Sequence, residues 1–459
     1  MNLRDLKEQS VANYLTRVSL ILALPLVVAA GESKDQLDLK QATDGFSKTM
    51  IQCPNRVWPN YDWRTFQVAI VQRGSTEAVL WKGSDTSANT IPASSLPQGS
   101  LNTTFSFITL NGINTMVLSP DQYYNTTGAV FRIGVHELFH RYGQRGWTYP
   151  RSRGTTYPQS PIPRLYRRML FDRLNQYLNS DGIDSTALGQ AAFWYSKWKN
   201  EFPTEAVTSA DAYEGTATFV EEVADAVRTL GCDAKETNLK EQAKALFVET
   251  RNGRSLSGSR FDLSFEGYDV GTIGALILRF IKNRSDWYSK MPSGQTPVSV
   301  LLDEVTPIND EAPAVLAKVF QDGAEAANKE IGQLVDSDLN AYRSTSFAKI
   351  SIATTWLHSN CSPRYFVLSS EIPNATIMPM NFELKFQSGS SHVETSPDKV
   401  LFIDPQNPCE GQGLVAMVNL SEISEKDRTI EITGPSINGH LEVTKLSATN
   451  GIWYCTGSH

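Results

Sequence analysis

The chain has 459 residues, a formal net charge of −7 at pH 7, and a composition with 41% hydrophobic and 20% charged residues. This length allows two or three domains of ordinary size, with enough apolar material for a core that does not depend on metals or disulfides. The acidic balance, with a pI near 5.5, lacks the basic footprint of nucleic-acid-binding proteins. We therefore expect a soluble globular protein that has no nucleic-acid partner.

The first thirty residues have the pattern of a secretory signal. Basic residues precede an uncharged run from Val18 to Ala30, about 13 residues long. A membrane-spanning helix needs about 20 apolar residues, so the run fits the apolar region of a signal peptide that ends in small residues. We predict a signal over residues 1–30 and a secreted or periplasmic mature protein without a stable membrane span. The alternative is an N-terminal membrane anchor, if the signal is not cleaved.

The next part of the chain changes from strand to helix patterns. From Gln52 to Ser119, short β-rich runs are separated by Gly, Pro, Asn and Ser, which predicts the strands of one sheet. From Gly128 to about Ala341, apolar residues recur at helical spacing. A sheet part followed by a helical part indicates an α+β domain, which we place over residues 31–345.

After about Ser346 the apolar residues alternate with polar ones, as in short strands. This pattern predicts a β-sandwich-like accessory domain over residues 346–459. Asn438-Gly439 is predicted as the hairpin turn between the last two runs.

The cysteines are scattered, at positions 53, 232, 361, 409 and 455, and none forms a CxxC pair. A zinc site built on thiolates is therefore not expected. In an oxidising compartment we expect one or two disulfides, first among the last three cysteines, with one thiol left over.

The sequence HELFH places His136 and His140 four positions apart. On a helix, positions i and i+4 lie on one face, so both imidazoles can point at one metal ion. Glu137 is rotated by about 100° from His136, so it can act on water at the metal without being a ligand. The alternative is two histidines with structural hydrogen bonds only. We favour a zinc ion held by His136 and His140, with Glu137 as the catalytic base.

A catalytic zinc site needs a third protein ligand and an open position. Glu214, near the start of a predicted helix, is the best candidate, and Gly215 beside it would let that helix pack closely against the HELFH helix. Three acidic residues further along the same helix are rivals, namely Glu221, Glu222 and Asp225. Glu221 shares the face of Glu214, so it is also a candidate to hold a ligating histidine from behind.

Taken in order, HELFH, EGTATFVEE and YDVGTIGAL resemble the gluzincin metallopeptidases, and most of all the catalytic domain of aminopeptidase N relatives. Those proteins carry HExxH, a helix of the form E-G-x-A-x-x-x-E, and a later helix that starts with Y-x-x-G-A. The resemblance implies a thermolysin/gluzincin-like fold for the first domain, with zinc on His136, His140 and Glu214 and with Glu137 as general base. It also implies that Tyr268 hydrogen-bonds the oxyanion of the tetrahedral intermediate.

The chain departs from that family in two respects. Glu214 lies 74 positions after His140, much further than in aminopeptidase N, so helices must be inserted between them. In addition, no GxMEN-like sequence precedes HELFH. Asn111 to Leu118 is a candidate edge strand for substrate backbone, but it lacks the glutamate that would hold a free substrate amine. Aminopeptidase specificity is therefore not expected.

The resulting hypothesis is an exported zinc metallopeptidase acting on a peptide or protein substrate, with an oligomeric state that the sequence does not indicate. One alternative is an inactive zinc-fold protein that binds a partner through its C-terminal β-domain. Another is a zinc hydrolase acting on a non-peptide amide, such as one in cell wall or glycan.

Overall fold

The structure is a computed structural model. It describes residues 37–456 with several gaps. The gaps are residues 61–65, 84, 86, 102, 121–123, 148–154, 207–209, 252, 259–262, 354–366, 370–371, 373–374, 381–382, 398, 405, 410–412 and 449–450. The predicted signal peptide therefore lies outside the described residues. Within the described part, no helix combines the length and the apolar character needed to cross a bilayer.

The β-rich runs form the strands of one sheet, as predicted, and this N-terminal sheet has the strand order β3-β2-β1-β5-β4. Its strands are β1 (Gln67–Ile70), β2 (Glu77–Lys82), β3 (Asn89–Pro92), β4 (Phe105–Leu110) and β5 (Ile113–Leu118). β1 and β5 are parallel, whereas the other neighbours are antiparallel. The expectation that Asn111 to Leu118 forms an edge strand is wrong, because β5 pairs with a strand on each side and β4 is the edge.

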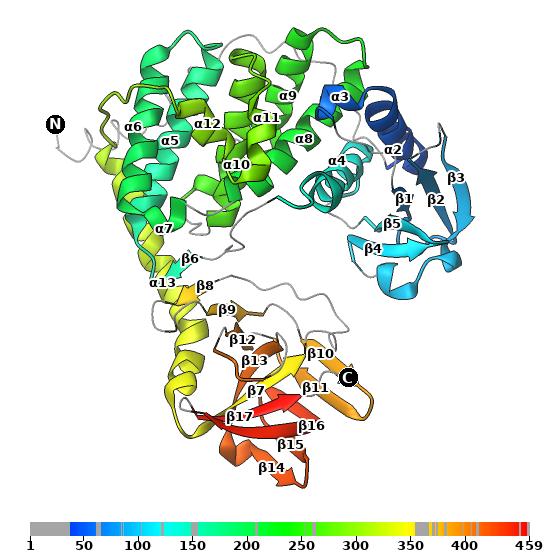
Figure 1. The fold of residues 1–459 in the computed structure, drawn as a ribbon, viewed down its shortest axis with the longest axis vertical. Coiled ribbons are helices and arrows are strands. Elements are labelled where there is room, and N and C mark those ends of the chain that lie inside the picture. Colours follow the sequence, from blue (N-terminus) through cyan, green and yellow to red (C-terminus); the bar gives the residue numbers. More distant parts are fainter. Residues whose placement is uncertain are drawn as a thin grey trace, which may run out of the picture.

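The helical part follows this sheet and continues to α13. Before the sheet lie α2 (Leu39–Phe46), η1 (Ser47–Gln52) and α3 (Pro54–Val57). After it come α4 (Thr127–Leu138), η5 (Phe139–Gly143), α5 (Pro161–Asn179), α6 (Ser185–Glu201), α7 (Pro203–Ala206), α8 (Ala210–Leu230), α9 (Glu236–Thr250), η6 (Arg254–Leu256), α10 (Leu263–Leu276), η7 (Ile277–Ile281), α11 (Trp287–Lys290), η8 (Met291–Ser293) and α12 (Pro297–Leu302). In Figure 1, α4 lies between the sheet and helices α8 and α10, whereas α2 lies beside the sheet. One hydrophobic core joins residues from all these layers.

Helices α8 and α10 pack backbone against backbone through glycines. A Cβ on Gly215 would lie 2.4 Å from Cα of Gly271, and one on Gly267 would lie 2.5 Å from the backbone of Ala210. Gly215 was expected to face the HELFH helix, which is wrong. A helix turns by about 100° per residue, so with Glu214 pointing at α4 the next residue faces α10 instead.

Two buried arginines of α5 tie the first turns of α8 and α10 together. Arg167 donates through Nη1 to Asp211 of α8 at 2.8 Å and through Nε to Glu266 of α10 at 3.3 Å. Nε of Arg164 also lies 3.3 Å from Glu266. Helix α5 belongs to the stretch that the spacing predicted as an insertion, and it braces the helix that carries Glu214.

The C-terminal part is built from α13 (Ala314–Arg343) and a twelve-stranded sheet system. Its strands are β6 (Thr155–Tyr157), β7 (Phe347–Ala353), β8 (Val367–Ser369), β9 (Thr376–Pro379), β10 (Leu384–Ser388), β11 (Ser391–Thr395), β12 (Val400–Ile403), β13 (Gly413–Asn419), β14 (Ile423–Lys426), β15 (Thr429–Thr433), β16 (Ile437–Ala448) and β17 (Gly451–Thr456). The long strand β16 pairs with β11 and β15 in its first half and with β17 in its second half. Two sheets therefore share one strand and enclose a common core.

Helix α13 leads from the helical part to these sheets and packs on the outer face of the sheet that contains β7 and β13 (Figure 1). The short strand β6, which lies between α4 and α5 in the chain, pairs in parallel with β8. The chain is thus a mixed α/β protein with a helical part and a C-terminal sheet region. One segment of the first 345 residues is built into that sheet region.

The predicted hairpin turn at Asn438-Gly439 is wrong, since both residues lie inside β16. The turn between β15 and β16 is instead at residues 434–436, where the Gly434 N–H donates to the carbonyl of Ile437 at 3.1 Å. Pro435 has no N–H for a strand ladder and suits the turn. Gly439 serves a close strand approach, because a Cβ there would lie 2.4 Å from the carbonyl oxygen of His392.

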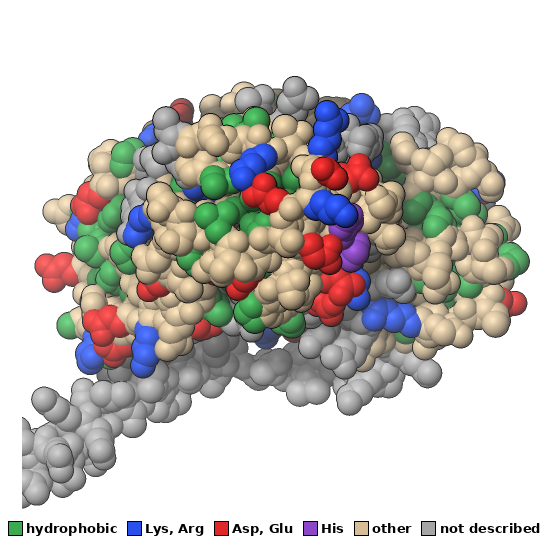
Figure 2. Space-filling model, turned by 90° about the horizontal axis from the view of Figure 1, so that it is seen from below, with side chains coloured by type: hydrophobic (Ala, Val, Ile, Leu, Met, Phe, Trp, Pro, Cys, Tyr) green, Lys and Arg blue, Asp and Glu red, His purple; other side chains and the backbone are tan. Residues whose placement is uncertain are grey.

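The outer face of these strands is polar. His392 and His440 are register partners on β11 and β16, and Nδ1 of His440 lies 3.0 Å from a carboxylate oxygen of Glu431. Figure 2, which views the end of the molecule that is lowest in Figure 1, shows acidic and basic side chains around a histidine. His392 is exposed and His440 is half-buried.

Two disulfides are present among the described cysteines. Cys409–Cys455 falls within the group that the sequence favoured, while Cys53–Cys232 joins the segment before the sheet to the end of α8. Cys361 is outside the described residues.

Candidate metal centre

The HELFH motif lies where α4 passes into the π-helical turn η5. The helix is capped at its start by Thr126, whose hydroxyl accepts from the N–H of Ala129 at 3.1 Å. Apolar side chains fix it in the core, so the imidazoles are held on a rigid element. His136 and His140 point the same way, with their Nε2 atoms 2.9 Å apart. The predicted helix and the shared face are both confirmed.

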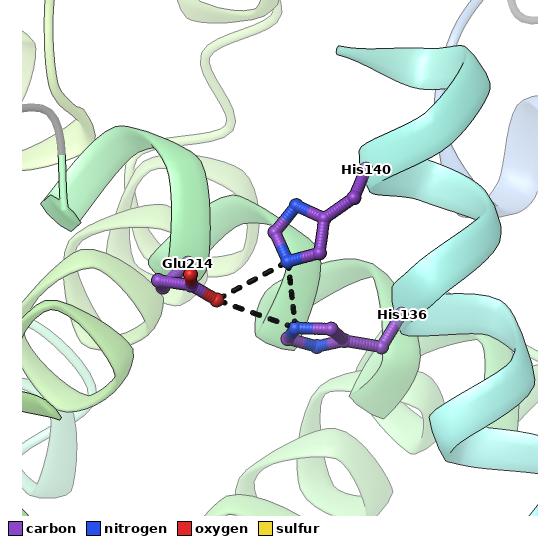
Figure 3. A group of neighbouring side chains, drawn as sticks. All are labelled: His136, His140 and Glu214. Atoms are coloured by element: carbon purple, nitrogen blue, oxygen red, sulfur yellow. Dashed lines mark hydrogen bonds and ion pairs between the residues drawn. The ribbon is translucent and has the colours of Figure 1, made fainter. Parts of the chain in front are cut away.

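Glu214, in the second turn of α8, brings its carboxylate to the two histidines (Figure 3). Its Oε2 lies 3.1 Å from Nε2 of His140 and 3.4 Å from Nε2 of His136. Ligand atoms around a tetrahedral zinc at the usual bond lengths lie about 3.3 Å from one another. The three separations bracket that value, and one carboxylate with two imidazoles is a donor set that zinc accepts. These residues therefore fit a zinc ion.

The electrostatics of this cluster favour a cation. Burial would lower the pKa of His136, but the carboxylates of Glu221 and Glu214 outweigh it and raise that pKa to about 10. Burial would likewise raise the pKa of Glu214, yet its hydrogen bonds with the two histidines hold the pKa well below the ordinary value. Negative charge that stabilises an imidazolium also stabilises a metal cation at the same place.

Both histidines are held from behind by polar side chains. A carboxylate oxygen of Glu221 lies 2.9 Å from Nδ1 of His136. The contact is an ion pair whose geometry is not that of a hydrogen bond. Nδ1 of His140 lies 2.6 Å from Oε1 of Gln144. Gln144 is itself anchored to α8, since its Nε2 donates to the carbonyl of Tyr213 and to the hydroxyl of Thr216. Such contacts fix the orientation of ligating histidines in metal sites.

The rival carboxylates have other partners. Glu222 accepts from the hydroxyl of Thr250 at 2.7 Å, and Asp225 pairs with Arg132 at 3.0 Å. Glu221 meets the far side of His136, the position that its spacing from Glu214 suggested. Among the described residues, only Glu214 groups with the two histidines as a set of three donor atoms within 4.8 Å of one another.

Glu137 and Tyr268 both line a cleft of about 650 Å³ that also exposes an edge of His136. Glu137 is half-buried, and burial raises the pKa of its carboxyl. The ring of Tyr268 lies parallel to that of His136, with 5.9 Å between their centres. The fold thus brings both predicted catalytic side chains to the mouth of the same cluster.

Sequence reasoning missed several residues at this site. Gln144 lies four positions after His140, so the spacing that paired the histidines could have found it. Tyr213, whose ring stacks on His140 at 4.2 Å, adjoins Glu214 in sequence. Arg251 and Arg254 reach the cleft from the turn after α9 and carry no sequence signal that links them to HELFH.

Comparisons with protein-family models, with curated proteins and with solved structures give no match to this chain.

Proposed function

We propose that this protein is an exported zinc metallopeptidase of the gluzincin type, which hydrolyses peptide bonds. The observation that carries the proposal is the convergence of His136, His140 and Glu214 at separations suited to one tetrahedral ion. The order of motifs along the chain and the cleft beside the cluster support it. Zinc, when bound, lowers the pKa of water and polarises a carbonyl group.

The chain's own residues have distinct tasks in this proposal. Glu137, at the cleft wall beside the ligands, accepts the proton of the attacking water and passes it to the leaving amine. The hydroxyl of Tyr268 donates a hydrogen bond to the carbonyl oxygen as negative charge develops there. Gln144 holds the tautomer and orientation of His140 through its hydrogen bond, and the Glu221 carboxylate supports the His136 ring through its charge.

Export is supported by one feature of the structure and one feature of the sequence. The disulfides Cys53–Cys232 and Cys409–Cys455 are typical of oxidising compartments. The apolar run at residues 18–30 has the length and flanks of a secretory signal. The mature protein is therefore proposed to act in the periplasm or outside the cell.

The test is peptide hydrolysis by purified protein, with and without a zinc chelator. Wild type should cleave a pool of internally quenched peptides, and the chelator should stop the reaction. Glu137→Gln should lower turnover by at least about a hundredfold, because general-base catalysis contributes that much or more. Glu249→Gln, an exposed carboxylate at the rim of the cleft, is the matched control and should keep activity. Full activity in Glu137→Gln would contradict the proposal.

A further inference from the structure

The cleft beside the metal cluster contains three arginines, Arg132, Arg251 and Arg254. They do not have equal freedom to bind a ligand. Arg132 already donates to the buried carboxylate of Asp225 at 3.0 Å, so its guanidinium is engaged within the protein. The charge that the cleft can offer to a substrate therefore comes from the turn after α9.

Arg251 is held at the cleft by two contacts that leave most of its donors unused. Its guanidinium lies 4.7 Å from the centre of the Tyr268 ring, and its Nη2 lies 3.5 Å from Glu221. Among the described residues its Nε is buried without a hydrogen-bond partner. A guanidinium has five N–H groups in a planar fork that matches a carboxylate. Arg251 therefore has both the position and the donors for a second anionic partner.

Arg254 is exposed and makes one long hydrogen bond among the described residues, from Nη1 to the carbonyl of Thr250 at 3.4 Å. It opens the short helix η6 directly after Gly253, whose φ of +77° is the left-handed conformation that glycine adopts freely. Arg254 lines the same cleft as Arg251.

The acidic groups of the cleft offset this charge only in part. Glu221 already faces His136 and Arg251, and Glu137 lies beside the two histidines. Glu249 is exposed at the rim, where solvent weakens its interactions. An anion that entered the cleft would thus meet Arg251 and Arg254 in its lining, with Tyr268 between Arg251 and His136.

We infer that Arg251 and Arg254 form a carboxylate-binding subsite, so that the preferred substrate carries a carboxylate near the bond that is cleaved. This inference rests on the proposed peptidase function. The carboxylate has two chemical sources, an acidic side chain or the free C-terminus of a peptide.

Binding can be measured without turnover. The Glu137→Gln protein, loaded with zinc, would be titrated with labelled peptides that differ only as Glu against Gln, and as free C-terminus against C-terminal amide. The carboxylate form of at least one pair should bind on the order of tenfold more tightly, because charge-assisted hydrogen bonds are the strong ones. The pair that shows the preference identifies the source of the carboxylate. Equal binding within both pairs would overturn the inference.

The arginine variants assign the preference to the subsite. Adding Arg251→Gln or Arg254→Gln to the Glu137→Gln protein should bring the ratio of dissociation constants for the two peptides of a pair toward one. Arg73 is an exposed arginine in the β1–β2 turn, and Arg73→Gln should leave this ratio unchanged. Both peptides of a pair are measured on one preparation, so loss of folded protein does not alter the ratio. A preference that survives both arginine changes would overturn the inference.

Turnover separates this inference from the proposed function. If wild type cleaves peptides and Glu137→Gln does not, while Glu and Gln peptides and both C-terminal forms are cleaved alike, the peptidase proposal stands and the subsite is refuted. If no peptide is cleaved by zinc-loaded wild type, the peptidase proposal itself is refuted. A higher kcat/KM for a carboxylate peptide, lost in Arg254→Gln, supports both.

Discussion

Gly215 and Gly271 bring α8 and α10 into direct backbone contact, since a Cβ added to Gly215 would lie 2.4 Å from Cα of Gly271. This contact sets the distance between two helices whose side chains meet α4. Glu214 adjoins one glycine, and Tyr268 lies one turn before the other. The close approach is therefore part of how the fold assembles the metal cluster.

Gly215→Ala should lower the free energy of unfolding by about 2 kcal/mol or more, because the new methyl group meets backbone that cannot move aside. The measurement is the midpoint of urea denaturation. Gly99→Ala is the control, since nothing lies within 4 Å of a Cβ at that exposed position. Equal midpoints for the two variants would show that α8 and α10 are not packed as described.

Arg167→Met should destabilise the fold by roughly 3–5 kcal/mol, because it removes the arginine that pairs with the buried carboxylate of Asp211 and leaves Glu266 with Arg164 alone. The comparison is Arg284→Met, which removes a pair with the exposed Asp286 and should change stability little. Thermal and chemical denaturation give both values. A small effect at Arg167 would mean that α5 does not brace the starts of α8 and α10.

The raised pKa of Glu222 predicts how the stability of the fold depends on pH. Burial, together with the neighbouring charge of Glu221, raises the pKa of Glu222 to about 8. Between about pH 4.5 and 8 the folded protein keeps this proton while the unfolded chain has lost it. The contribution of Glu222 to the free energy of unfolding should therefore fall as pH rises through that window. Each unit of difference between the folded and unfolded pKa corresponds to about 1.4 kcal/mol.

Glu222→Gln mimics the protonated acid, so the free energy of unfolding of this variant should decline less between pH 4.5 and 8. A series of denaturation curves from pH 4.5 to 8.5 measures the decline. Thr250 can still donate its hydroxyl to the amide oxygen. Glu249→Gln, an exposed neighbour, should keep the wild-type slope. If Glu222→Gln declines as steeply as wild type, Glu222 is ionised in the folded protein.

Glu221→Gln tests the support behind His136. Removing a carboxylate that orients a ligating histidine should weaken zinc affinity about 10- to 100-fold, measured by competition with a chromogenic chelator. The loss of zinc affinity should act through the His136 ring, because Nδ1 of that ring lies 2.9 Å from the Glu221 carboxylate. Glu249→Gln should bind zinc as wild type does. An unchanged affinity in Glu221→Gln would exclude this supporting role.

Local features of the site could be predicted from the sequence because helical geometry fixes them. The spacing of His136 and His140 determines their common face. Glu214 and Glu221 also share one helix face, which predicted Glu214 as a metal ligand and Glu221 as a carboxylate that supports a ligating histidine. The 74-position gap between His140 and Glu214 could not be bridged by such reasoning. The choice among acidic residues of α8 depends on the tilt of that helix, which Gly215 and Gly271 set through tertiary contact.

The sheets show where local signals fail. Asn438-Gly439 carries a strong turn signal, but the pairing of β16 with β11 and β15 overrides it and uses Gly439 for a close strand approach. The same limit applies to β5, whose interior place in the sheet depends on parallel pairing with the distant β1. Strand order follows long-range contacts, which alternation of apolar residues does not encode.

The most direct test is the metal content of purified protein after exposure to zinc and removal of the excess. Wild type should retain about one zinc per chain, and Glu214→Ala should lose it while its circular dichroism spectrum stays that of a folded protein. Glu249→Ala, an acidic residue of the same cleft, should retain the metal. Folded wild type without zinc, or Glu214→Ala with a full equivalent, would contradict the assignment of His136, His140 and Glu214 as the metal ligands.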